Sequence, residues 1–297
     1  MRYTVKEIHK MKNTLIASSI ALALSTTAAL ADITIGGDAR MGVVYTESTT
    51  SVDNEAQFDS RVRFTLSGAG VTDNGLSFGA STRIDQSGQG GTANNDSTVF
   101  VGTDMVTVTF GDVDGAAKGA VGNVAGVGYT GIGDNNEVGY LGVDATGVSV
   151  AATAGVIDVY ASFGQRQATN DDNAQGIGAS VTVAGVELSA GYAEDGAVSQ
   201  QALGAGVDVA GLGLSAVYLD HDNHATADAE MAASASYTMG SVTLTGFYRE
   251  VENLTGANDT YTGVGASHDL GGGATLAGGI VDQDGTNRMD LGLNFAF

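Results

Sequence analysis

Apolar and polar side chains alternate along most of this chain, in segments of roughly ten residues separated by turn-rich breaks. Between residues 33 and 45, one face of the segment is apolar and the other carries Thr34, Asp38 and Arg40. The same alternation recurs along residues 57–66, 76–85 and 287–297. Period-two alternation is typical of β-strands, because successive side chains point to opposite faces. We therefore expect an all-β chain.

The polar faces of these segments contain charged side chains well inside the strands, among them Arg61, Arg63 and Asp85. A soluble β-sandwich also alternates, but its inner face is apolar. An arginine facing lipid costs roughly 2–4 kcal/mol at the bilayer centre, so arginine confined to the polar face indicates a wet interior and a lipid-facing exterior. Aromatic side chains near strand ends resemble two interfacial girdles. They are Tyr45, Tyr192, Tyr218 and Tyr248 at one end, and Tyr237, Phe295 and Phe297 at the other. The pattern predicts a transmembrane barrel.

The number of alternating segments predicts the size of this barrel. Segments begin near residues 33, 57, 75, 98, 105, 147, 156, 175, 185, 201, 212, 229, 241, 259, 274 and 287. We predict a 16-stranded antiparallel β-barrel, wide enough for an aqueous channel, with short turns at one end and longer loops at the other. Residues 136–144 could form a further strand, but an odd number would place the termini on opposite sides. We therefore assign them to a loop.

The first 31 residues have the features of a secretory signal peptide. Lys10 and Lys12 precede an apolar stretch from residue 15 to 24, and Ala29 and Ala31 form an A-x-A cleavage site. We predict a signal peptide over residues 1–31, with Met11 as an alternative start, and a barrel domain over residues 32–297. The barrel would reach the outer membrane of a Gram-negative cell after export through the periplasm.

Composition excludes several classes of protein. The formal net charge of −22 argues against nucleic-acid binding, and the absence of cysteine excludes disulfides and thiol chemistry. We find no catalytic constellation and expect no enzyme activity. His221 and His224 could bind a metal weakly, but a solvated external loop is the favoured interpretation of that stretch.

One long segment, from Asp112 to about Thr146, interrupts the alternation. Loops of this length in a compact fold are usually functional. Its acidic candidates are Asp112, Asp114, Asp134 and Glu137, beside a single basic residue, Lys118.

Four arginines share the polar faces of the first three strands. Arg40, Arg61, Arg63 and Arg83 would be lateral neighbours there and form a basic patch on the inner wall. The alternative is that they pair locally with Asp38, Asp59 and Asp85 as inert wall charges. An acidic loop opposite a basic wall would create a transverse field across a narrow passage.

The chain resembles the Gram-negative general-diffusion porins, most closely the alphaproteobacterial, Rhodobacter-type members. The stretches that match are DITIGGDAR (residues 32–40), SRVRF (60–64), VTVTFGDVD (106–114) and the terminal Phe297. The resemblance implies that the long loop folds into the barrel and forms a constriction with the arginines. It also implies a homotrimer, and calcium at loop carboxylates in some members; otherwise we expect no cofactor. This chain departs from the family in lacking tryptophan and in being shorter.

The expected function is passive diffusion of ions and small hydrophilic solutes through a water-filled pore with weak cation preference. The alternative is a barrel with a structural or adhesive role and no open pore. The expected partners are the lipid bilayer and lipopolysaccharide, permeating solutes, two further copies of the chain and the barrel assembly machinery, for which Phe297 resembles the recognition signal.

Overall fold

The computed structural model describes residues 32–47, 55–87, 92–93, 96–143, 147–165 and 173–297. The predicted signal peptide lies outside these residues and stays a prediction. The first half of the wall consists of β1 (Asp32–Thr46), β2 (Glu55–Val71), β3 (Ser77–Ser87), β4 (Thr92–Ala93), β5 (Ser97–Gly102), β6 (Val106–Gly111), β7 (Gly147–Ala154) and β8 (Ile157–Gly164). The second half consists of β9 (Ala174–Val183), β10 (Val186–Asp195), β11 (Val198–Val209), β12 (Leu212–Asp222), β13 (Ala227–Met239), β14 (Val242–Asn253), β15 (Asp259–Gly271), β16 (Ala274–Gln283) and β17 (Thr286–Ala296).

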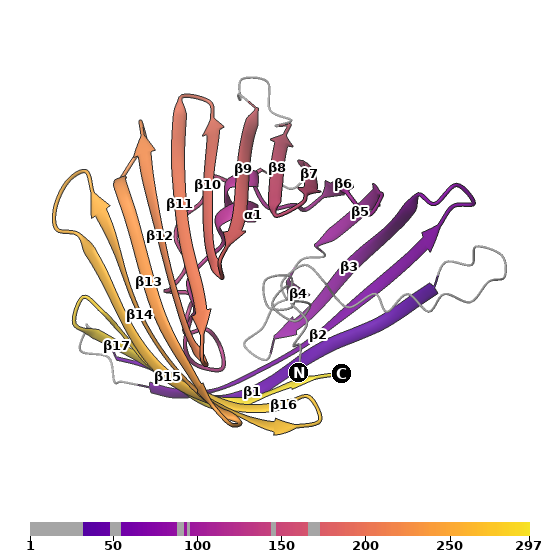
Figure 1. Ribbon diagram of the computed structural model, residues 1–297. Coiled ribbons are helices and arrows are strands. Elements are labelled where there is room, and N and C mark those ends of the chain that lie inside the picture. Colours follow the sequence, from indigo (N-terminus) through magenta and orange to yellow (C-terminus); the bar gives the residue numbers. More distant parts are fainter. Residues whose placement is uncertain (1–31, 48–54, 88–91, 94–95, 144–146, 166–172) are drawn as a thin grey trace.

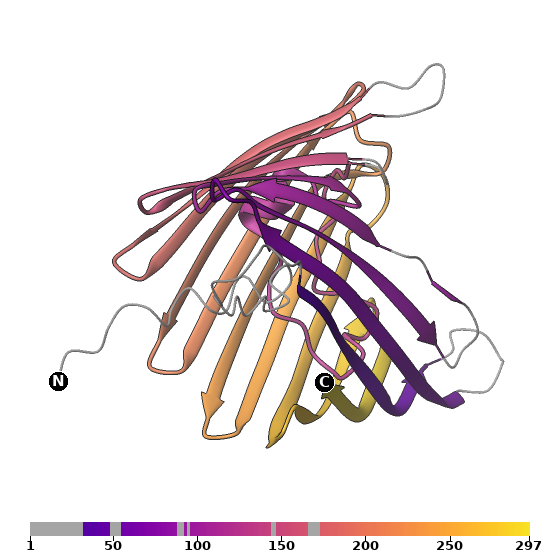
Figure 2. The ribbon, with the colours of Figure 1, turned by 90° about the vertical axis from the view of Figure 1, so that its right-hand side faces the viewer.

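These strands form a closed antiparallel barrel (Figures 1 and 2). Each long strand pairs with the next in sequence, and β17 pairs with β1 from Asp38–Ala296 to Thr46–Arg288. The last residue continues this seam, because Phe297 and Gly37 exchange two backbone hydrogen bonds. The two-residue β4 pairs with β3 just ahead of β5, which itself pairs with β3. If β4 and β5 are counted as one strand, sixteen strands close the ring, which confirms the predicted number.

Two-residue turns join many strands at one end of the barrel. Ala184 and Gly185 both have positive φ, 53° and 84°, and Ala210 and Gly211 repeat the pattern with 52° and 84°. Such pairs form the turn type whose twist matches that of paired strands. The longer connections lie at the opposite end, although β10–β11 and β16–β17 are also joined there by two-residue turns. Residues 136–143 contain no strand, as predicted.

The barrel is apolar outside and polar inside. Ile33 is 78% exposed and Leu291 is 61% exposed, whereas Asp59 and Asp85 are buried in the interior. A water-soluble protein would have the opposite distribution of these side chains. The outer surface therefore suits lipid, as the alternation predicted.

No helix in the described part of the chain is long and apolar enough to cross a membrane.

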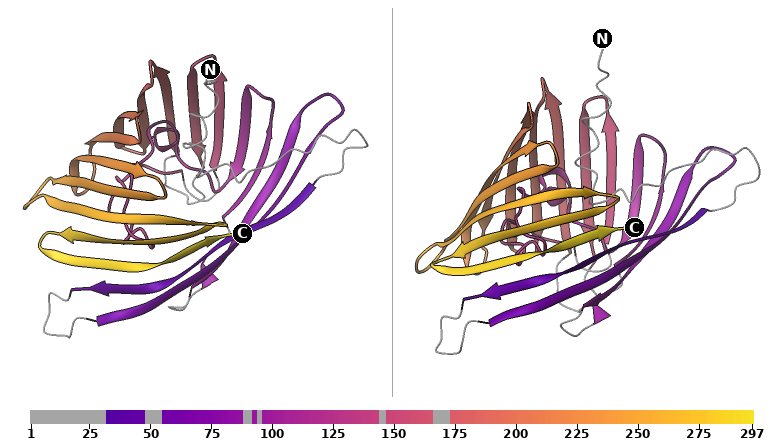
Figure 3. Two further views of the ribbon diagram at one scale, coloured as in Figure 1. Left: turned by 60° about the horizontal axis from the view of Figure 1, so that its bottom comes forward. Right: turned by 90° about the horizontal axis from the view of Figure 1, so that it is seen from below.

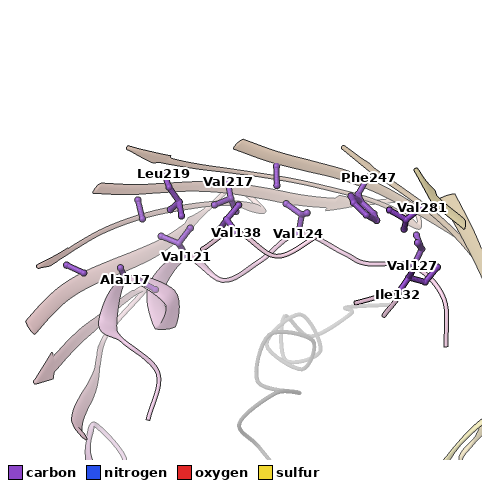
Figure 4. Close-up of a cluster of buried hydrophobic side chains, with 14 residues drawn as sticks. Ala117, Val121, Val124, Val127, Ile132, Val138, Val217, Leu219, Phe247 and Val281 are labelled. Carbon is purple, nitrogen blue, oxygen red and sulfur yellow. The ribbon is translucent and has the colours of Figure 1, made fainter. Parts of the chain in front are cut away.

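The long segment after β6 folds back inside the barrel. It begins with the short helix α1 (Ala116–Val121), which packs against β8, β9, β10 and β11 (Figure 3). The following residues run along the inner wall and bury an apolar cluster against it (Figure 4). In this cluster Val121, Val124, Val127, Ile132 and Val138 of the loop meet Val217, Leu219, Phe247 and Val281 of the wall. The buried apolar side chains of this barrel therefore attach the long segment to the inner wall.

The two ends of this loop lie close together. β6 and β7 stay paired up to Gly111 and Gly147. A Cβ atom placed on Gly115 would lie 2.8 Å from the carbonyl oxygen of Leu141 and 3.9 Å from the Cα atom of Gly142. Residues 116–141 thus form a closed excursion into the lumen, which we call the inner loop.

Candidate functional site

Four arginines lie together on the inner faces of β1, β2 and β3, as the alternation predicted. Each one forms an ion pair with a nearby aspartate. Arg40 lies 3.0 Å from Asp59, and Arg61 lies 3.1 Å from Asp38. The arginine wall, meaning Arg40, Arg61, Arg63 and Arg83, is therefore interleaved with carboxylates. Local pairing, the alternative considered above, is what the structure shows for these side chains.

Asp85 is the central acceptor of this network. Arg63 donates two hydrogen bonds of 2.9 Å to its two carboxylate oxygens, and the Arg83 Nε lies 3.2 Å from one of them. Arg83 also pairs with Asp96 at 2.5 Å. Paired guanidinium groups hold fixed orientations, because the planar fork matches a carboxylate. Pairing therefore reduces the net field of the wall but fixes the positions of its charges.

Asp112 is a loop carboxylate that interacts with the arginine wall. Its backbone N–H donates to the Ser97 carbonyl, and its carboxyl group lies beside Asp96 and Arg83. Partial desolvation, together with the negative charge of Asp96, raises the pKa of Asp112 despite the opposing effect of Arg83. The loop and the wall therefore share one electrostatic cluster at this point.

Asp114 and Glu137 form a second group with Lys118. The Lys118 ammonium lies 3.0 Å from the Asp114 carboxylate, and all three residues, with Asp112, line a cavity of about 210 Å³. Partial desolvation of its carboxyl group raises the pKa of Glu137; Lys118 opposes this shift, while Asp134 and Asp114 add to it. Asp134 itself lies outside this cavity, in a turn where its N–H bonds to the Gly131 carbonyl. The structure thus groups three of the four predicted loop carboxylates.

No group of three or more His, Asp or Glu side chains in the described ranges converges as a metal site. Calcium at loop carboxylates stays a prediction.

The first anchor of the inner loop is Asp290 on β17, a residue that the sequence analysis did not single out. Its two carboxylate oxygens accept hydrogen bonds from the Tyr129 N–H at 3.1 Å, the Thr130 N–H at 2.8 Å and the Thr130 hydroxyl at 2.5 Å. Arg40 also donates to the Thr130 carbonyl at 3.4 Å. Asp290 therefore fixes the loop backbone next to the arginine wall.

The second anchor is a buried polar network on β11 to β14. Gln200 accepts from the Leu141 N–H at 3.1 Å and donates to the Gly139 carbonyl at 2.8 Å. Glu230 accepts from the Gly139 N–H at 3.1 Å and from Arg249 at 2.8 Å. The segment 139–141 is therefore held by side chains, although it forms no regular structure.

His221 belongs to this second anchor, and its expected place in a solvated loop is wrong. It lies on the inner face of β12 with its side chain 1% exposed. β12 continues to Asp222, into the polar stretch that was read as a loop, and its alternation places both Leu219 and His221 on the inner face.

Glycine on the inner faces makes room for the loop. A Cβ atom on Gly191 of β10 would lie 2.6 Å from the Cα atom of Ala117, and one on Gly279 of β16 would lie 2.8 Å from the Gly128 backbone nitrogen. No side chain other than hydrogen fits at these approaches. In the sequence, glycines recur on the polar faces of several strands. This recurrence is the signal that could have located the loop along the wall.

We expect Gly204→Leu on β11 to displace the inner loop. A Cβ atom there would lie 2.8 Å from the Val121 side chain, and overpacking of this kind costs about 1–3 kcal/mol. Thermal unfolding in detergent should show a lower transition temperature. Gly206→Leu is the matched control, because the same face of the same strand offers open space, with only a carbonyl oxygen at 3.8 Å. Equal stability of the two variants would contradict this packing.

Comparison with known proteins agrees with this architecture. Residues 17–288 match the family described as Gram-negative porin. The chain belongs to this family. The porin of Rhodobacter capsulatus is 30% identical over 90% of this chain and its own full length, and that of Fuscovulum blasticum is 24% identical over the same shares. Among solved structures, a substituted variant of Rh. blastica porin superposes with a TM-score of 0.77 at 20% identity, covering 90% of this chain and 100% of that one.

Membership of the family identifies the barrel as an outer-membrane porin channel of a Gram-negative cell. The barrel interior agrees with a channel, because charged side chains line the lumen while the apolar loop side chains are packed away against the wall. Family membership thus favours the channel over the structural or adhesive barrel considered as the alternative.

Proposed function

We propose that this porin is a weakly cation-selective diffusion channel for ions and small hydrophilic solutes, constricted between the inner loop and the arginine wall. The observation that carries the proposal is the pairing of every wall arginine with aspartate. Paired arginines contribute little net positive charge, whereas Asp112, Asp134 and Glu137 are exposed at the loop. Fixed charges near a narrow passage select ions more strongly than charges elsewhere. The local excess of carboxylate therefore favours cations.

Reversal potentials across a KCl gradient test this proposal. We expect a modest cation preference for the unmodified porin and a stronger one for Arg63→Ala, because the substitution leaves Asp85 with one fewer partner and adds one net negative charge to the wall. Arg61→Ala should act in the same direction through Asp38. Anion preference of the unmodified porin, or unchanged potentials in both variants, would exclude the proposed constriction.

Acidification provides a second test of the loop carboxylates. The raised pKa values of Asp112 and Glu137 mean that both groups take up protons at a higher pH than ordinary carboxylates do. Cation preference should therefore begin to fall while the pH is still above about 4.3, the value of a free glutamate. Reversal potentials measured from pH 7.5 to 4 should show this early loss, and Glu137→Gln should reduce its amplitude.

The remaining assignments are proposed from family resemblance and from the outer surface. A homotrimer, lipopolysaccharide contact, calcium binding, export with removal of residues 1–31, and recognition of Phe297 by the barrel assembly machinery are consistent with the chain. Phe297 is 61% exposed on the outer surface, where its ring lies 5.8 Å from that of Phe64. An assembly factor could therefore reach it without opening the barrel.

A further inference from the structure

His221 lies on the inner wall beside the side chains that hold the inner loop. Its Nδ1 atom lies 3.3 Å from the Gln200 amide nitrogen, and its Nε2 atom lies 3.6 Å from a Glu230 oxygen. Gln200 is fully buried and Glu230 is 6% exposed. These two side chains hold segment 139–141 against the wall. His221 therefore contacts both side chains of the second anchor.

The loop backbone determines which way the Gln200 amide points. The Leu141 N–H needs an acceptor, so the amide oxygen faces it, and the Gly139 carbonyl needs a donor, so the amide nitrogen faces that. The nitrogen is then also the atom that faces His221 Nδ1. An amide nitrogen only donates, so Nδ1 has to be an acceptor without a proton. The hydrogen-bond pattern of the loop is thus compatible only with neutral His221, protonated at Nε2.

Protonation of His221 would place two donors against each other at this contact. A rotated Gln200 amide could accept from the imidazolium, but it would then present its nitrogen to the Leu141 N–H and its oxygen to the Gly139 carbonyl. Both hydrogen bonds to the loop would be lost, and buried polar groups without partners are costly. The alternative movement, His221 turning toward Glu230, competes with the bonds that Glu230 accepts from Gly139 and Arg249.

Other charged groups around His221 do not relieve this conflict. Arg249 on β14 already pairs with Glu230 and stacks over Tyr261, 4.8 Å from the ring centroid. The His224 ring lies 4.8 Å away, and its Nδ1 accepts the Ala227 N–H. Glu137 and Tyr140 of the loop interact electrostatically with Arg249 and Glu230, respectively, and Asp195 lies at the end of β10, two strands from β12.

We propose that His221 is a positioning residue for the inner loop and that its protonation releases segment 139–141 from the wall into the lumen. Acidification would then close the pore intermittently, because His221 Nδ1 would change from an acceptor to a donor at its buried contact with Gln200. This proposal does not depend on which ions the channel prefers. With equal KCl on both sides of the membrane, ion selectivity does not affect the measurement that tests it.

Single-channel recordings in symmetric KCl at pH 7.5 and pH 5 test this inference. In the unmodified porin, we expect the ratio of closed to open time to rise on acidification on the order of tenfold, the effect of losing hydrogen bonds of ordinary strength. His221→Asn should abolish this rise, because the Asn oxygen can accept from Gln200 near the position of Nδ1 and does not titrate. His268→Asn on the exposed face of β15 is the matched control and should keep it.

Loop mobility provides a readout that titration of pore carboxylates would not change. The chain contains no cysteine, and a Cβ atom on Gly142 would meet nothing within 4 Å. A spin label on Gly142→Cys should become more mobile at pH 5 in the otherwise unmodified porin and not with His221→Asn. Gln200→Ala should show the mobile spectrum and frequent closures at both pH values. Equal acid response with and without His221, or unaltered behaviour of Gln200→Ala, would overturn the proposal.

Discussion

Removal of residues 116–141 is expected to raise the single-channel conductance more than any point substitution in this porin. Joining Gly115 directly to Gly142 spans a gap that the folded chain already closes, since a Cβ atom on Gly115 would lie 3.9 Å from the Gly142 Cα atom. The inner loop lies inside the lumen, so its removal should widen the passage that we propose it constricts. The wall should persist because β6 and β7 remain paired from Val106–Ala152 to Gly111–Gly147.

Conductance in symmetric KCl and the uptake of sugars of increasing size into liposomes measure this effect. The deletion exposes Glu230, Arg249 and Asp290 to water that can solvate them, so we expect a folded barrel with a lower thermal transition rather than a failure to fold. Circular dichroism in detergent is the control for the barrel. A folded deletion variant with unchanged conductance would show that the inner loop does not limit the passage.

Asp290→Ala is expected to have the largest effect of any single substitution on loop position. The three groups that bond to Asp290, two backbone N–H groups and the Thr130 hydroxyl, would lose a charged acceptor, and a hydrogen bond to a charged group contributes about 1.5–3 kcal/mol. Segment 129–130 would then leave the wall. We expect noisy currents with frequent partial closures at neutral pH, measured in planar bilayers.

Two companion variants separate this anchoring role from general damage to β17. Asn294→Ala changes the same inner face four residues further along and should leave the currents quiet. Asp290→Asn keeps one acceptor oxygen and should be intermediate between the unmodified porin and Asp290→Ala. If Asn294→Ala is as noisy as Asp290→Ala, the effect comes from the strand and not from the anchor.

The alternation of side chains was sufficient to predict the wall of the barrel. Strand positions, their number and the face that each side chain occupies follow from a period of two, because in a strand neighbouring side chains must point to opposite sides. Ile33 and Arg40 therefore lie outside and inside as expected. Strand ends do not follow from the alternation alone: His221 was misplaced because the polar residues around it read as a loop, although β12 continues to Asp222.

The interior was only partly predictable. Sequence alone brought Arg40, Arg61, Arg63 and Arg83 onto one wall, but it left open whether they stand free or pair with aspartate. The pairing of Arg63 with Asp85 depends on the register between β2 and β3 and on side-chain rotamers, which no local pattern encodes. The constriction itself, as a combination of loop and wall, stays a prediction for the experiments above.

The amino-acid sequence by itself determined the barrel, because strand alternation is a local property that each segment carries independently. The tertiary structure alone decided where the inner loop lies. Its contacts join Tyr129 to Asp290 and Leu141 to Gln200 across long sequence separations. Such contacts depend on ring closure first bringing β11 to β14 and β17 around one lumen, so the residues that hold the loop could be identified only in the closed barrel.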